Sequence, residues 1–94
     1  MLHLIFQSPT ISAILDRIES GDDVVFLESA VFQLNCDGIF SRKINELLDE
    51  NIFLYVLQEE LETRGIEVNE RVSIIDYPGL VELTEKNKVI KTWS

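Results

Sequence analysis

Short apolar runs alternate along this chain with segments whose apolar residues recur at helical spacing. Residues 2–6, 24–27 and 52–57 are apolar runs without regular polar alternation, apart from His3 in the first. Runs of this kind are typical of strands buried on both faces, as in parallel sheets covered by helices. Residues 72–75 and 88–93 are two further strand candidates.

A first helix is predicted between the first two strands. Ser8 is a favourable N-cap and Pro9 suits the first helical position. Apolar residues then recur at spacings of three and four, and Ser20-Gly21 is a usual helix end. The residues of this apolar face are Ile11, Ile14, Leu15 and Ile18.

Three more helices are predicted further along. Residues 41–50 carry Ile44, Leu47 and Leu48 on one side, and residues 59–64 end at Gly65. Asp76-Tyr77-Pro78 repeats the capping pattern of the first helix. The buried side of that last helix is expected to hold Leu80, Val81 and Leu83.

Regular alternation of strand and helix with short connections predicts an α/β fold: three layers, α/β/α, around a mostly parallel sheet of about five strands. Ninety-four residues are expected to form a single domain, 1–94. The pattern leaves the strand order open.

Composition narrows the classes of function. Seventeen Asp and Glu residues against eight Lys and Arg give a formal net charge of −9, with the basic residues scattered. Nucleic-acid binders and proteins of anionic membrane surfaces normally present basic patches, so direct binding to either is disfavoured. Because the chain has no apolar run of about 18–20 residues, no signal-peptide pattern and a single cysteine, we expect a cytoplasmic protein without disulfides.

Motifs for cofactors are missing from the sequence. Neither a Walker loop nor G-x-G-x-x-G occurs, and no cofactor or metal is predicted. Asp22 and Asp23 stand at the entry to a strand, whereas a phospho-receiver needs its carboxylates at strand carboxyl ends. They are therefore interpreted as a solvated turn.

Three further features have a structural interpretation beside a functional one. His3, the single histidine, is predicted to be a core residue with one ring nitrogen bonded to the backbone, because no second metal ligand stands near it in sequence. Trp93 is interpreted as a core or interface anchor rather than a platform for bases. The acidic run 59–62, EELE, is most simply a solvated helix face, and alternatively a negative patch for a basic partner.

Cys36 is the only thiol and the only candidate for catalysis. It precedes Asp37-Gly38, in a segment expected to be exposed, with a helix predicted shortly after it. A thiol reacts as thiolate, from a reference pKa near 8.5 that a helix N-terminus lowers and that the adjacent Asp37 raises. Both a sulfur-carrying role and a purely structural role stay open on these residues.

An ordered set of segments resembles one known family over essentially the whole chain. The set consists of MLH at the start, Ser8-Pro9, Gly21-Asp22, Asp37-Gly38, YVLQEELETRGI (55–66), IDY (75–77), VELT (81–84) and Trp93. Together they resemble the TusB/DsrH family, the B-type subunits of sulfur-relay complexes.

The resemblance implies a DsrE/F/H-like α/β/α fold and assembly with C-type and D-type subunits into a heterohexamer. In its TusBCD form such a complex passes persulfide sulfur toward 2-thiouridine synthesis at the tRNA wobble position, and in its DsrEFH form it serves sulfur oxidation. The D-type subunit carries the acceptor cysteine. Some DsrH members have a further cysteine in the first helix, where this chain has Ile14. This departure favours the TusB-like branch and a structural role.

Three hypotheses follow. The chain is a non-catalytic subunit of a cytoplasmic sulfur-relay complex for tRNA thiolation, or it carries persulfide itself through Cys36, or it is an α/β interaction domain outside sulfur metabolism.

Overall fold

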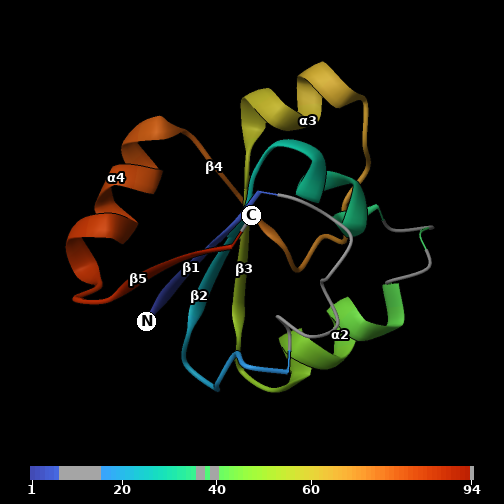
Figure 1. The fold of residues 1–94 in the computed structure, drawn as a ribbon. Helices are drawn as coiled ribbons and strands as arrows, with labels where there is room; N and C mark the ends of the chain where they lie inside the picture. The colour runs from blue at the N-terminus through green and yellow to red at the C-terminus, as the bar shows by residue number, and fades with distance from the viewer. Residues whose placement is uncertain (7–15, 36–37, 39–40, 94) are drawn as a thin grey trace.

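The structure, a computed structural model, describes residues 1–6, 16–35, 38 and 41–93. A five-stranded sheet runs through this part of the chain (Figure 1). All the predicted strand regions form strands, with ends shifted by one or two residues. The strands are β1 (Leu2–Ile5), β2 (Asp23–Phe26), β3 (Phe53–Leu57), β4 (Ser73–Ile75) and β5 (Ile90–Trp93).

The strand order is β4-β3-β2-β1-β5, and every pairing of neighbours is parallel. β2, β3 and β4 are added one after another on the same side of β1, and β5 then pairs with the other side of β1. Because parallel crossovers are right-handed, the return connection passes over the opposite face from the earlier ones. Figure 1 shows this: α4 lies on one side of the sheet, and the other described helices lie on the other. The predicted three-layer α/β fold is confirmed.

The helices begin and end close to the predicted positions. α3 ends at Gly65, whose φ of 63° is the left-handed conformation that glycine adopts readily. Asp76 caps α4 by accepting a hydrogen bond from the Gly79 N–H. A 3₁₀ helix after β2 was not predicted. The elements are η1 (Glu28–Leu34), α2 (Ser41–Asp49), α3 (Gln58–Arg64) and α4 (Tyr77–Lys86).

The larger hydrophobic cluster lies on the sheet face covered by η1, α2 and α3. It joins alternate strand residues such as Val24 and Phe26 to Ile44 and Leu47 of α2. Ile18, from the predicted face of the first helix, is buried in this cluster. The rest of that face and Ser8-Pro9 lie outside the described residues.

The opposite sheet face is covered by α4, which contributes Leu83 and Leu80 to a smaller cluster with Leu2, Val25 and Leu57. Val81 was expected to be buried here and that prediction was wrong, since its side chain is 53% exposed. At about 100° per residue, Val81 points away from the stripe formed by Leu80 and Leu83.

Candidate functional site

Cys36 and Asp37 lie outside the described residues, so a sulfur-carrying role for Cys36 stays a prediction. The described neighbours on either side are Asn35, which bridges to Val68, and Gly38, whose N–H donates to the Asn35 carbonyl at 2.9 Å.

His3 lies in β1 and is 1% exposed. Its Nε2 is 2.9 Å from Asp22 Oδ2, and its Nδ1 is 3.1 Å from Trp93 Nε1. The expected backbone partner was wrong, because both ring nitrogens bind side chains. The parallel register explains the first contact: His3 pairs with Val24, and Asp22 precedes Val24 by two residues, on the same face.

The tautomer of His3 follows from the chemistry of its partners. An indole N–H only donates, so Nδ1 of His3 must accept from Trp93 and carries no proton. The proton therefore resides on Nε2, which donates to the Asp22 carboxylate. The interplanar angle of the two rings is 18°, which is compatible with an N–H···N hydrogen bond in the plane of the imidazole. Trp93 is thus a half-buried anchor, as predicted.

Asp22 and Asp23 were interpreted as a solvated turn, and that interpretation was wrong, because both residues are buried. Asp22 accepts hydrogen bonds from His3, from the Glu19 N–H at 3.0 Å and from the amino group of Met1 at 3.3 Å. Burial by itself raises the pKa of Asp22, but the hydrogen bonds from Glu19, His3 and the amino group outweigh it. The pKa therefore lies below its ordinary value of 3.8.

Asp23 faces the other side of the sheet, where it joins β2 to β3 and to the end of α4. It accepts from the Tyr55 hydroxyl at 3.2 Å and from Asn87 Nδ2 at 3.1 Å, and Lys86 Nζ lies 3.5 Å away. Burial, together with the charge of Asp23 and its hydrogen bond, raises the pKa of Tyr55 above 10.0. A signal for both clusters is present in the sequence: His3, Tyr55 and Trp93 each stand inside a predicted strand. Because buried polar groups need hydrogen-bond partners, each of them indicates a polar partner elsewhere in the chain.

Two cations lie beside the indole of Trp93. Lys91 Nζ is 4.3 Å and the Arg17 guanidinium carbon 5.7 Å from a ring centroid, within the range of cation–π contacts. The indole nitrogen is already bonded to His3. Trp93 is therefore occupied by contacts within the chain rather than presented as a platform for a base.

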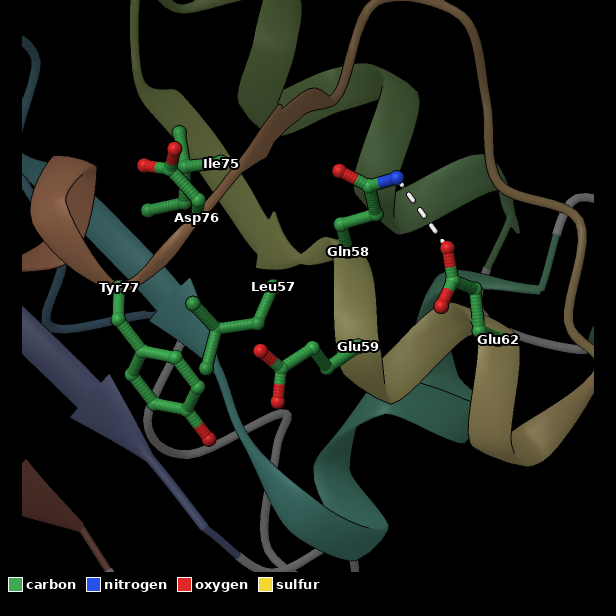
Figure 2. A pocket seen from close by; sticks show the side chains of 7 residues that line it. All are labelled: Leu57, Gln58, Glu59, Glu62, Ile75, Asp76 and Tyr77. Carbon is green, nitrogen blue, oxygen red and sulfur yellow. Dashed lines mark hydrogen bonds between the residues drawn. The ribbon is translucent and has the colours of Figure 1, made fainter.

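A pocket of about 230 Å³ opens at the carboxyl ends of β3 and β4, the edge at which open α/β sheets bind ligands (Figure 2). Leu57 and Ile75 supply apolar surface and Tyr77 an aromatic ring, while Glu59, Glu62 and Asp76 supply carboxylates. Gln58 completes the lining and donates to Glu62 at 3.2 Å. Part of the acidic run 59–62 is thus a pocket wall as well as a solvated helix face.

Within the described ranges, His, Cys, Asp and Glu side chains nowhere gather in a group of three that would hold a metal ion. No helix of the described part is long and apolar enough to span a membrane.

Several large apolar side chains are exposed at the margins of the sheet. Ile90, Leu2, Asp23 and Phe53 form one row across four strands on the α4 face. The inner two are buried, whereas Ile90 is 44% and Phe53 46% exposed. α4 therefore covers the middle of this row and leaves its two ends, Phe53 and Ile90, partly open.

Comparison with known proteins identifies the family. The profile described as "DsrH like protein" matches residues 5–90. Relatives called Protein TusB align over 99% of this chain and 100% of their own length: from Erwinia tasmaniensis at 36% identity, from Buchnera aphidicola subsp. Schizaphis graminum at 37%, and from Serratia proteamaculans at 34%. Since both matches run along nearly the whole chain and accord with the parallel α/β sheet, the chain belongs to the TusB/DsrH family.

Proposed function

We propose that this chain is a non-catalytic subunit of a cytoplasmic sulfur-relay complex that acts in 2-thiolation of the tRNA wobble uridine. In this role it is a single domain, 1–94, that completes and positions a persulfide-carrying D-type subunit, together with a C-type subunit. The observation that carries the proposal is the match to TusB relatives over essentially the whole chain.

The uneven cover of the sheet supports an interaction role. Phe53 and Ile90 are large apolar side chains at two ends of one row, each close to half exposed. Apolar surface of this kind is stabilised when another protein covers it. A neighbouring subunit packed beside α4 would bury both side chains and extend the cover that one ten-residue helix gives.

The charge of the chain supports an indirect relation to tRNA. A net charge of −9 repels the phosphate backbone. In the proposed complex the tRNA is bound by other proteins, and this subunit contributes to the sulfur-transfer steps that precede it.

Co-expression with C-type and D-type subunits tests the assembly. We expect the three chains to co-purify as one species larger than any of them alone, on gel filtration at moderate salt. Phe53→Glu should reduce co-purification, because it places a charge on the surface to be buried. The matched variant Phe32→Glu, at a side chain of η1 with similar exposure on the other side of the sheet, should not. If the wild-type chain does not co-purify with the C-type and D-type subunits, the proposal is refuted.

Cys36→Ser separates the architectural role from the carrier role. In the proposed role, wobble-uridine thiolation and persulfide loading of the D-type subunit stay at the wild-type level. Loss of thiolation in an intact complex would instead make Cys36 part of the relay. Normal tRNA thiolation after deletion of the chain, with impaired sulfur oxidation, would assign it to the DsrEFH-type pathway.

A further inference from the structure

The pocket at the carboxyl ends of β3 and β4 is not explained by an apolar interface near Phe53 and Ile90, which lie at the amino ends of their strands. We propose that this pocket receives one lysine or arginine side chain from a partner protein of the relay complex. This inference rests on the proposed function for the nature of the partner and adds the chemistry of the contact.

The lining of the pocket matches the two parts of a long basic side chain. Leu57 is buried and Ile75 half-buried, so the floor is apolar, and the aromatic ring of Tyr77 forms one wall (Figure 2). Lys and Arg place their methylene stem on apolar surface while the charged end stays polar. A guanidinium or ammonium group also gains from the face of an aromatic ring.

The charge of the pocket is wholly negative. Its ionisable groups are the carboxylates of Glu59, Glu62 and Asp76, together with the Tyr77 hydroxyl, and no cation lines it. Every Lys and Arg of the chain falls within the described residues, yet none of the observed ion pairs involves these three carboxylates. The nearby Arg64 is bound to Glu60 at 2.8 Å. A cation from outside the chain would supply the missing counter-charge.

Local hydrogen bonds account for only part of this arrangement. Asp76 Oδ1 accepts from the Gly79 N–H as a helix cap, and Glu62 accepts from Gln58. Both donors are neutral, so these hydrogen bonds cancel none of the negative charge that lines the pocket. Glu59 has no hydrogen-bond partner among the described residues, and its side chain points into the pocket in Figure 2.

The volume of the pocket and its negative charge favour a basic side chain over other ligands. About 230 Å³ lies below the roughly 300–1,000 Å³ of small-molecule and cofactor sites, and suits one long side chain. Phosphates and RNA are repelled by the same carboxylates. Of the two interpretations of the acidic run 59–62, a solvated face or a patch for a basic partner, this proposal takes the second.

The test is the affinity of the C-type and D-type subunits for a triple variant, Glu59→Gln, Glu62→Gln and Asp76→Asn. Asparagine is as good an N-cap as aspartate, so α4 keeps its cap. Each exposed charge pair contributes modestly to binding. We expect the loss of all three carboxylate charges to raise the dissociation constant about tenfold in low salt. The salt dependence of binding should fall as well, because fewer charges are then paired.

A second triple variant controls for the change in net charge. Its residues are exposed and stand near the amino ends of β3 and β4, at the opposite edge of the sheet: Glu46→Gln, Glu50→Gln and Glu70→Gln. We expect it to bind like the wild-type chain.

The outcomes separate the two proposals. If the pocket variant binds as tightly as the wild-type chain, or if both variants bind equally weakly, the proposal of a basic side chain in the pocket is wrong and the proposed subunit role is unaffected. A wild-type chain that binds neither subunit overturns the subunit role, and this inference with it. Saturable shifts of the Gln58 and Gly79 amide resonances on adding Mg²⁺ or spermidine to the isolated chain would assign the pocket to a small cation instead.

Discussion

The carboxylate of Asp22 offers a quantitative test of the buried polar cluster. Its Oδ2 accepts from His3 Nε2 at 2.9 Å and from the Glu19 N–H at 3.0 Å. Asp22→Asn keeps the shape of the side chain but removes its charge. A hydrogen bond to a charged group contributes about 1.5–3 kcal/mol and a neutral one about 0.5–1.5 kcal/mol. Two such bonds therefore predict a loss of about 2 kcal/mol in the free energy of unfolding at pH 7.

The pH dependence of this difference follows from the lowered pKa of Asp22. The folded-state pKa lies below 3.8, the ordinary value that the unfolded chain is expected to show. The folded carboxylate thus holds protons less readily than the unfolded one, and its contribution to stability is fully present above the unfolded pKa. That contribution is lost as the pH falls through the folded pKa. The gap between wild type and variant should accordingly narrow below about pH 3.8.

Urea unfolding followed by circular dichroism, at pH 7 and in steps toward acid, measures both quantities. Asp16→Asn is the matched control, because that side chain is 72% exposed and pairs with Lys43 at 3.5 Å. It should change the free energy of unfolding by less than about 0.5 kcal/mol. An Asp22→Asn chain as stable as the control at pH 7, or a gap that persists undiminished into acid, would refute the reasoning.

Three further predictions concern the rest of the polar clusters and the second sheet face. Trp93→Phe removes the indole donor to His3 Nδ1, which has no other donor among the described residues, so the free energy of unfolding should fall by about 1–3 kcal/mol in urea melts; an unchanged value would contradict that hydrogen bond. In a spectrophotometric titration, Tyr55 should ionise above pH 10.0, because burial and the Asp23 carboxylate raise its pKa, and Tyr55→Phe should remove that component of the absorbance change. Leu83→Ala should cost about 2–4 kcal/mol in the same urea melts, whereas Val81→Ala should stay within about 0.5 kcal/mol, because Leu83 is buried under α4 and Val81 is exposed. Equal losses for the two α4 variants would mean that the stripe facing the sheet is wrongly assigned.

The clusters around Asp22 and Asp23 connect the two faces of the sheet at one point in the chain. Asp22 binds His3 on the face of η1, α2 and α3, and Asp23 binds Tyr55 and Asn87 on the face of α4. Adjacent strand residues point to opposite faces, so two consecutive aspartates reach both layers. A single pair of residues thereby ties β1, β2, β3 and the end of α4 together.

The strand and helix positions could be predicted from the sequence because their signals are local, and the family resemblance because the order of its segments along the chain is itself part of the sequence. The apolar run 52–57, which lacks polar alternation, predicts a buried strand whatever its position in the sheet. β3 occupies residues 53–57 of this run. Gly65 and Asp76 end and begin helices through contacts within four residues. These parts of the prediction needed no knowledge of the tertiary structure.

Strand order, the buried aspartates and the acidic pocket depended on the tertiary structure. His3 is hydrogen-bonded to Asp22, 19 residues away in sequence, and to Trp93, 90 residues away. The residues next to His3 in sequence therefore do not indicate either partner. Asp22-Asp23 looks like a solvated turn by composition, and only the pairing of β1, β2 and β3 buries it. The pocket likewise exists because β3 and β4 are neighbours, which brings Glu59 and Asp76 into the lining of one pocket. Local preference decides which elements form, and packing between distant segments decides which polar groups they enclose.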